Sequence, residues 1–389
     1  MVKKSVYLDN SASTRVLDEV VSAMIPYFTE IYGNPSSLHS FGIKAKKALD
    51  DSRKIVANSI NANPEEIIFT SGGTESDNIA VFGVAAARKD GRIITTKIEH
   101  PAIKNTVQKL KTQGFEVLFI DVDYEGFINI KQLEESINAD TILVSIIHAN
   151  NEIGTIQDIE TIGNIIKTKN PNTYFHVDAV QSYMKLPIDV VSAKIDLLSI
   201  ASHKIHGPKG VGALYIRNGV KLKSLQLGGS HEKNLRAGTE NVPGIVGFAK
   251  AVELNLVDLE EYTKNLVFLR DRLIDGIEKR IPHVILNGPR GVSRNSNNVN
   301  ISFKHIEGES ILLYLDMQGI AVSTGSACSS TSLKPSHVLE AIGLPVEICH
   351  GSIRFTLSRY TTKEEIDYVL EVFPKIIAKL RALSPLNAN

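Results

Sequence analysis

The chain has 389 residues, 43% of them hydrophobic and 22% charged, which is an ordinary composition for a soluble globular protein. Its 43 Lys and Arg residues balance 43 Asp and Glu residues, so no excess of charge favours a nucleic-acid or membrane partner. Apolar runs such as 142–147 are too short to cross a bilayer, and the first ten residues lack the apolar segment of a signal peptide. Two cysteines, Cys328 and Cys349, make no disulfide framework, so we expect a cytoplasmic protein with free thiols.

The first three-fifths of the chain alternates short apolar runs with helical patterns. The expected helices cover residues 43–59, 74–87, 103–113 and 159–169. Several of the expected strands are nearly continuous in apolar residues, as strands buried on both faces are; they cover 67–70, 92–96, 116–120, 142–148, 174–177, 197–201 and 212–216. This alternation predicts an α/β domain built on a large, mainly parallel sheet of seven strands.

The rest of the chain predicts a smaller α+β domain. A Gly-rich stretch at 228–244 precedes a long helical pattern through roughly 245–280, and NVNISF (298–303) and SIRFTL (352–357) have the pattern of strands. We expect a large domain over 15–257, and a small domain formed by 1–14 with 258–389 that carries a mobile cysteine loop at about 321–334.

FTSGGTESDN, residues 69–78, places two glycines between an expected strand and an expected helix. Glycines let the backbone turn sharply, and the free N–H groups of a helix N-terminus attract phosphate. A tight turn capped by Thr74 gives the same pattern without a ligand, so this stretch alone does not decide between the two.

Two charged side chains follow buried strands. Asp178 ends the strand of FHVDAVQS (175–182), where a carboxylate fits a protonated ring nitrogen, a salt bridge or a helix cap. Lys204 leaves the strand of SIASHKIHGPKG (199–210), where it fits either a Schiff base with an aldehyde or an ordinary solvated lysine; Lys209 is a rival further from the strand. A phosphate anchor, a ring-nitrogen partner and an aldehyde partner, gathered at strand ends, are what pyridoxal phosphate needs.

With these motifs the sequence resembles the cysteine desulfurases of the NifS/IscS type, in the class V aminotransferase-like family of fold-type I enzymes that use pyridoxal 5′-phosphate. The resemblance covers essentially the whole chain in the family's order, through YLDNSAST (7–14), NPSSLH (34–39), TSGGTESDN (70–78), EHPA (99–102), HANNEIG (148–154), HVDAVQ (176–181), SHKIHGPKG (202–210), GGSHEKNLRAGTEN (228–241), STGSACSS (323–330) and SIRFTLSR (352–359). It implies the fold-type I architecture of a large and a smaller domain.

The resemblance also implies roles for single residues. Lys204 forms the Schiff base and then takes the Cα proton of the substrate, and His100 stacks on the cofactor ring and transfers protons. Asp178 pairs with the ring nitrogen and Gln181 with the ring hydroxyl. The phosphate is bound by Gly73, Thr74, Ser202 and His203, and by Thr239 from the other subunit of a homodimer. Arg354 clamps the substrate carboxylate, assisted by Asn34 and by Asn151, which also contacts the cofactor; Asn150 is the alternative to Asn151. Taken alone, Arg354 also fits a strand-edge charge and His100 a helix cap.

Cys328 lies among Ser, Thr, Gly and Ala in AVSTGSACSSTS (321–332), whereas a structural cysteine usually has apolar neighbours. By resemblance it is the nucleophile: its thiolate takes the sulfur of L-cysteine as a persulfide and leaves L-alanine. The implied acceptor is an iron–sulfur scaffold protein of the IscU or NifU kind. Cys349 has no counterpart in the family's pattern, and we expect it to pack in the interior.

Three other functions are weighed against this one. A selenocysteine lyase or another class V enzyme keeps the cofactor but needs no thiol on this loop. An inactive protein that uses the fold as a platform would lack Lys204, Asp178 or Cys328, and a nicotinamide dehydrogenase would carry a G-x-G-x-x-G motif, which we do not find. The sequence assigns no metal site and leaves open whether Cys328 ligates a cluster transiently.

Overall fold

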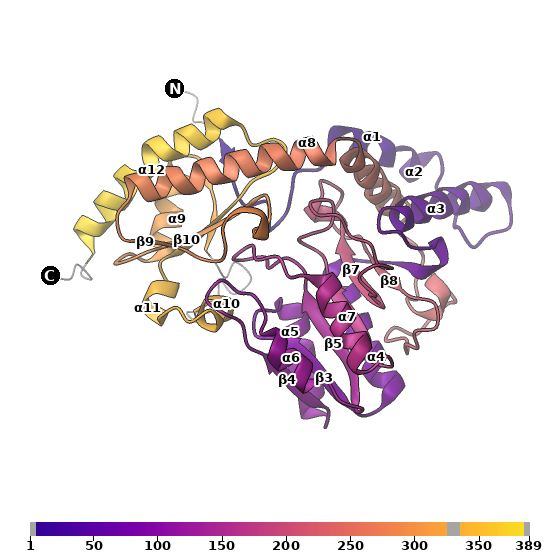
Figure 1. Ribbon diagram of the computed structural model, residues 1–389. Helices are drawn as coiled ribbons and strands as arrows, with labels where there is room; N and C mark the ends of the chain where they lie inside the picture. Colours follow the sequence, from indigo (N-terminus) through magenta and orange to yellow (C-terminus); the bar gives the residue numbers. More distant parts are fainter. Residues whose placement is uncertain (1–4, 325–334, 385–389) are drawn as a thin grey trace.

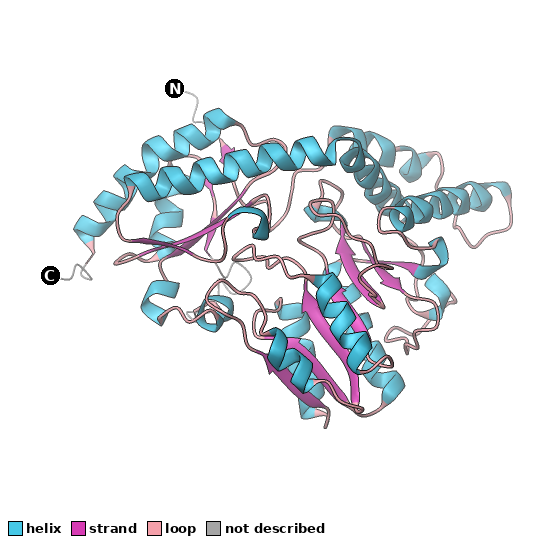
Figure 2. Ribbon diagram, in the orientation of Figure 1, coloured by secondary structure: helices cyan, strands magenta, loops and turns pink. Residues whose placement is uncertain are grey.

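The computed structural model describes residues 5–324 and 335–384, in which a large sheet between helices adjoins a smaller α+β unit (Figures 1 and 2). The helices are α1 (Asp18–Met24), α2 (Pro26–Thr29), α3 (Ser40–Asn58), α4 (Gly73–Arg88), α5 (Pro101–Thr112), α6 (Ile130–Ser136), α7 (Ile159–Lys169), α8 (Val242–Arg280), α9 (Gly308–Met317), α10 (His337–Ala341), α11 (Val346–Cys349) and α12 (Lys363–Leu383). Short 3-10 turns are η1 (Pro64–Glu66), η2 (Ser202–Lys204), η3 (Glu232–Asn234) and η4 (Gly291–Ser293).

The predicted large sheet of seven strands is confirmed among the described residues. Its strands are β2 (Ile67–Thr70), β3 (Arg92–Thr96), β4 (Glu116–Ile120), β5 (Thr141–Ile147), β6 (Tyr174–Asp178), β7 (Leu197–Ala201) and β8 (Gly212–Ile216). They lie in the order β2-β8-β7-β6-β5-β3-β4. All pairings from β7 to β4 are parallel, whereas β8 is antiparallel to both β7 and β2, so the sheet is mixed and mainly parallel.

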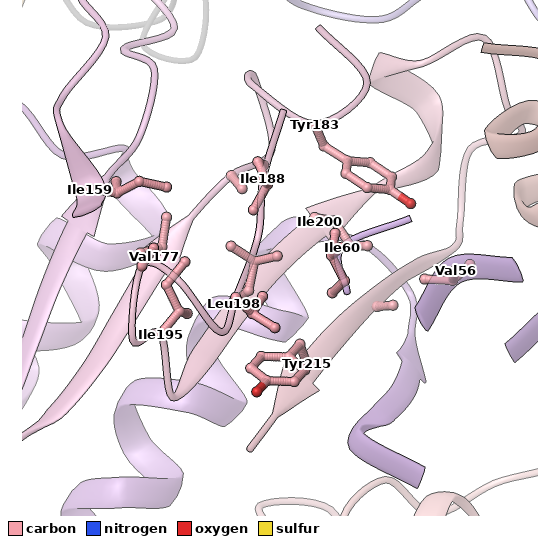
Figure 3. Close-up of a cluster of buried hydrophobic side chains, with 14 of the residues drawn as sticks. Val56, Ile60, Ile159, Val177, Tyr183, Ile188, Ile195, Leu198, Ile200 and Tyr215 are labelled. Atoms are coloured by element: carbon pink, nitrogen blue, oxygen red, sulfur yellow. The ribbon is translucent and has the colours of Figure 1, made fainter. Parts of the chain in front are cut away.

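The strands form because their side chains are buried on both faces of the sheet. Leu198 and Ile200 of β7 enter a hydrophobic cluster with α3, α6, α7 and α8, of which Figure 3 shows a part. Leu197 of the same strand enters the opposite cluster, with α4 and α5. The register sets Asp178 at the end of β6 beside Ile147 of β5 and Ser199 of β7, so these carboxyl ends share one edge.

The smaller unit holds its own sheets and core. β12 (Ser323–Thr324), β13 (Ser352–Thr356), β10 (Asn298–Phe303) and β9 (Val284–Leu286) form an antiparallel sheet, while β1 (Val6–Tyr7) pairs with β11 (Ile320–Ala321). Val6 and Leu8 enter the same hydrophobic cluster as α9 and α12. The two strand patterns predicted in this part of the chain are thereby confirmed.

The long helix α8 runs along the top of both units in Figure 1 and departs from helical geometry at Asp258 (φ −127°, ψ 18°). The predicted division of the chain into 15–257 and 1–14 with 258–389 coincides with this kink. The division stays a prediction, supported by the separate hydrophobic clusters on either side.

The short helices α1, α2 and α6 were not predicted, because seven residues or fewer give little periodic pattern. Within residues 5–324 and 335–384, every helix is too short or too polar to serve as a membrane span.

Candidate active site

A cavity of about 590 Å³ lies where the carboxyl ends of the large sheet meet the smaller unit. This volume is in the range of small-molecule sites in proteins. It brings together nine of the predicted residues: Gly73, Thr74, His100, Asn151, Asp178, Gln181, His203, Lys204 and Arg354. The segments that carry them are up to about 280 residues apart in the chain, so the grouping is a product of the fold.

One end of the cavity is formed by the start of α4. Gly72 is its N-cap, with φ 152° and ψ −177°, a backbone conformation open almost only to glycine. The first-turn residues Gly73 and Thr74 line the cavity, and the N–H groups of a first helical turn have no partner inside the helix. An anion fits this end because of those donors and the helix dipole.

Asp178 lines the cavity at the end of β6 and is 3% exposed. Its Oδ1 accepts a hydrogen bond from the Val180 N–H at 3.0 Å. Burial raises the pKa of Asp178 above its usual value. A carboxyl held in this way is stabilised by a protonated ring nitrogen that comes within hydrogen-bond distance.

Lys204 belongs to η2, immediately after β7, rather than to an open loop. Its Nζ donates to the carbonyl of Ser11 and, at 2.9 Å, to that of Ala12. The Ser11 carbonyl also accepts from Gln181 Nε2 at 3.0 Å. Gln181, which follows β6, and Lys204, which follows β7, therefore donate to the same backbone carbonyl of the N-terminal segment. His203 lines the same cavity. Its pKa is lowered to about 4, mainly by burial and in second place by the positive charge of Lys204.

His100 combines the two roles that the sequence left as alternatives. It is the N-cap of α5, where Nδ1 accepts from the Ala102 N–H at 3.1 Å, and its ring also lines the cavity. Burial, followed by the nearby Lys204 and His337, lowers the pKa of His100 to about 4. The ring is therefore neutral at physiological pH, which suits both the cap and contact with an aromatic ring.

Arg354 lies on β13, paired with Asn300 of β10 on one side and Ser323 of β12 on the other. It is 3% exposed, which excludes a strand-edge charge. Nη1 donates to the Asn151 carbonyl at 3.0 Å and Nη2 to Asp9 Oδ1 at 3.1 Å. Its Nε has no hydrogen-bond partner among the described residues, so a donor remains for a ligand at this wall.

Asn151, the predicted choice, lines the cavity, whereas the side chain of Asn150 forms hydrogen bonds with backbone groups. The side chain of Asn150 donates to the Ile98 carbonyl at 2.8 Å and accepts from the Glu152 and Ile153 N–H groups. The geometry thus separates two neighbours that the sequence could not.

Four predicted residues are not among those that line the cavity. Ser202 is fully buried beneath it, and its Oγ has no partner in the described part of the chain. Asn34 and Thr239 are exposed and lie outside it. Cys328 and most of the predicted mobile loop fall on 325–334, outside the described residues.

Several residues of the cavity were missed by sequence reasoning. Ser11 lies in the YLDNSAST stretch, and Asp77 and Lys104 follow Gly73 and His100 by one helical turn, a spacing that could have identified them. Glu152, beside Asn151, accepts from Ser336 Oγ at 2.5 Å, and burial raises its pKa to about 7. Asp77 is buried, and its Oδ1 has no hydrogen-bond partner among the described residues, although His176 Nε2 lies 3.7 Å away.

Cys349 packs in the interior, as predicted for it. It is 3% exposed in a cluster with Val338 and Leu339, and its Sγ contacts the Leu344 carbonyl at 3.5 Å. Burial raises the pKa of this thiol to about 11, so it stays protonated and unreactive. Across the described ranges, no cluster of His, Cys, Asp and Glu has the arrangement of a metal site.

The architecture and the cavity define a protein of the class V aminotransferase type. The family model for aminotransferase class V matches residues 6–369, and the chain belongs to this family. Its relatives include a protein named cysteine desulfurase IscS from Clostridium botulinum, 55% identical over 388 residues, covering 99% of this chain and 97% of the relative. Another of that name, from Dictyoglomus turgidum, is 52% identical over 386 residues, with the same shares covered.

Solved structures agree with this assignment. One described as a NifS-like protein superposes with a TM-score of 0.91 at 41% identity, covering 97% of this chain and all of that one. Another, described as SspA in complex with cysteine, gives a TM-score of 0.81 at 36% identity, covering 92% of this chain and all of that one. The predicted family and fold-type I architecture are confirmed.

Proposed function

We propose that this chain is a pyridoxal 5′-phosphate-dependent cysteine desulfurase, which converts L-cysteine to L-alanine and supplies sulfur for iron–sulfur cluster assembly. The observation that carries the proposal is the single cavity that joins a helix N-terminus, a buried carboxylate, Lys204 and Arg354. Relatives named cysteine desulfurase, identical at half or more of the positions over nearly the full chain, support the same activity.

The residues present fit pyridoxal phosphate. The first turn of α4 with Gly73 and Thr74 suits the phosphate, Asp178 suits the protonated ring nitrogen, and Lys204 suits the aldehyde carbon. Gln181, which donates to the Ser11 carbonyl, lines the same cavity and suits a hydrogen bond with the ring hydroxyl. When bound, this cofactor supplies an electron sink that lowers the barrier to breaking bonds at the substrate Cα and Cβ.

The substrate is held by Arg354 and Asn151. The guanidinium of Arg354, whose Nε has no hydrogen-bond partner among the described residues, would bind the substrate carboxylate in a bidentate contact that fixes its orientation. Lys204 Nζ is then the base that takes the Cα proton, because Lys204 lines the same cavity as Arg354. The neutral ring of His100 would stack on the cofactor ring, and its Nε2–H would remain a hydrogen-bond donor, because Nδ1 accepts from the Ala102 N–H.

Sulfur leaves through Cys328. Its thiolate attacks the substrate sulfur, the substrate C–S bond breaks, and the carbon skeleton gains a proton to become alanine. The balance is one L-cysteine and one Cys328 thiol giving one L-alanine and one Cys328 persulfide. A thiol reductant or an acceptor protein is needed to release the sulfur and to regenerate the thiol.

A homodimer completes the site. Asn34 and Thr239 are exposed in the single chain, and Thr239 is assigned to the phosphate of the other subunit. Large apolar side chains on α1–α3 and the loop between α2 and α3 are exposed to solvent: Ile25, Phe28, Tyr32, Leu38, Phe41 and Ile43. A patch of this kind supports an interface between two copies. An iron–sulfur scaffold protein of the IscU or NifU kind is the proposed acceptor, and the cytoplasm the proposed compartment.

The test is an anaerobic assay of cofactor-loaded protein with L-cysteine and dithiothreitol, in which alanine and sulfide are quantified. Wild type is expected to form them in equal amounts, and Cys328→Ala to form almost none. Cys349→Ala is the matched control and is expected to retain activity, because that thiol is buried and protonated. Full product from Cys328→Ala would instead favour a selenocysteine lyase or another class V enzyme.

A further inference from the structure

Lys185 is a buried lysine that the proposed reaction leaves without a role. It lies at the end of the turn that follows β6 and is 5% exposed. Within the described residues, no carboxylate lies within 4.0 Å of its Nζ. An amine buried without a counter-ion is destabilising unless its hydrogens are accepted elsewhere, so its partners indicate what it does.

The partners of Lys185 are two backbone carbonyls of the cavity. Nζ donates to the carbonyl of Gln181 at 3.0 Å and approaches that of Lys204 at 3.4 Å. The Gln181 carbonyl also accepts from Asn295 Nδ2 of the smaller unit at 3.0 Å. Lys185 thus joins the turn that carries Gln181 to the turn that carries Lys204.

The side chain of Lys185 is held in this place by its neighbours. Tyr183 and Met184 are buried in the hydrophobic cluster beneath the sheet, where Figure 3 labels Tyr183. The hydroxyl of Tyr183 forms a hydrogen bond with Ser59 Oγ at 2.6 Å. The two preceding side chains are thus anchored in the core, which fixes the backbone of the turn next to Lys185.

Lys185 also lies within electrostatic reach of Lys204. Burial, followed by the charge of Lys204, lowers the pKa of Lys185 to about 7. The other titratable groups that respond to Lys185 are His203 and His206, and burial lowers the pKa of both to about 4. Both histidines are therefore neutral near pH 7, and Lys204 is the cationic side chain whose charge acts on Lys185.

We propose that Lys185 is a positioning residue for the same reaction: its amine holds the Gln181 turn against the Lys204 turn and, when protonated, places a positive charge near the amine of Lys204. The inference rests on the proposed function, in which Lys204 carries the cofactor and takes the substrate proton. A base beside another cationic group gives up its own proton more readily, which keeps it ready to accept one from the substrate.

The experiment compares the bound cofactor in wild type, Lys185→Met and Lys185→Gln by titrating its visible absorbance band from pH 5 to 10. Both variants remove the charge, and only the glutamine keeps a donor for the carbonyls. We expect the pH midpoint of the band to rise by about 0.5–1 unit in both. The cofactor dissociation constant should weaken more in Lys185→Met, and kcat at pH 7 should fall about threefold to tenfold while KM for cysteine stays within twofold.

Lys209→Met, an exposed lysine on the loop after η2, is the control and should titrate like wild type. Melting curves of the cofactor-free proteins show which variants fold, and Lys185→Gln decides if Lys185→Met does not. An unchanged midpoint in a folded, cofactor-bound variant overturns the proposal and leaves Lys185 with a packing role only. A visible band that is unchanged in Lys204→Ala overturns the proposed function itself, whatever Lys185 does.

Discussion

Burial decides what the single residues of this site can do. From the sequence alone, Arg354 also fits a strand-edge charge and His100 a helix cap. In the fold both residues line the cavity, and His100 caps α5 as well. Burial keeps His100 neutral and raises the pKa of the cavity carboxyls Asp77, Glu152 and Asp178 and of the neighbouring Glu99. The protein therefore shifts the pH at which each of these groups gains or loses its proton.

The guanidinium of Arg354 can be tested with Arg354→Lys. A lysine keeps the charge but loses the planar pair of donors, so KM for cysteine should rise about tenfold to a hundredfold while kcat changes less than about threefold. Arg359→Lys is the control, because Arg359 pairs with Asp258 and does not line the cavity. A large fall in kcat with KM unchanged would show that Arg354 acts on the chemical step instead.

Glu99 offers a test by pH. Burial raises its pKa to about 8 in the folded protein from the ordinary value of 4.5, so the folded state retains a proton that the unfolded state loses. Its contribution to stability therefore decreases as pH rises from about 4.5 to 8. Glu99→Gln removes this dependence and can still accept from Thr96 and Ile147.

The measurement is the melting temperature of the cofactor-free proteins. The difference between Glu99→Gln and wild type is expected to shift in favour of Glu99→Gln by roughly 2–5 °C as pH rises from 5 to 9. Glu65→Gln, at an exposed glutamate, should show a difference that does not vary over this range. A constant difference for Glu99→Gln too would mean that Glu99 is ionised in the folded protein at pH 5.

At the scale of elements, the strand-to-helix and strand-to-turn junctions position the chemistry. β2 leads into α4, β3 into α5 through His100, β6 into the Gln181 turn and β7 into η2. Each junction follows a fully or nearly fully buried strand, whose end is fixed by the sheet, so the first side chain beyond it is fixed as well.

Gly72 tests the first junction. Gly72→Ala should destabilise the protein by about 1–3 kcal/mol, because an L residue is strained at φ 152° although no atom blocks its Cβ. It should also weaken cofactor binding about tenfold, since the start of α4 would move. Gly114→Ala is the matched control: φ is 98°, its Cβ is also unobstructed, and it lies between α5 and β4 away from the cavity. It should lose stability and leave the cofactor dissociation constant unchanged.

On the scale of the whole molecule, one chain does not hold every predicted group of the site. Asn34 and Thr239 are exposed on loops, while an apolar patch covers α1–α3 beside one of them. The proposed dimer accounts for both observations, because the patch would be covered and the loops would approach the other cavity.

Leu38→Glu tests the dimer. Leu38 is 94% exposed, so the change should leave the fold of one chain intact and place a charge in the interface. Light scattering should show monomer at concentrations where wild type is a dimer, with cofactor affinity at least about tenfold lower. Val292→Glu, at a residue 97% exposed on η4, should stay dimeric. A dimeric Leu38→Glu protein would place the interface elsewhere.

The sequence predicted much of the fold because local pattern carried it. Seven apolar runs became the seven strands of the large sheet, and the helix over 74–87 differs from α4 by only one residue at each end. The phosphate turn, Asp178 and Lys204 were recognisable because each follows a buried strand, and parallel strands end at the same edge.

The tertiary structure alone decided which neighbours face the cavity and how their protons are held. Asn150 and Asn151 are equivalent in sequence, but only the second reaches the cavity. Lys185 reads as an ordinary charged residue until the fold buries it under Gln181 and Lys204. The reason is that burial and long-range contact set both the direction of a side chain and its pKa, and neither is encoded in a short stretch of sequence.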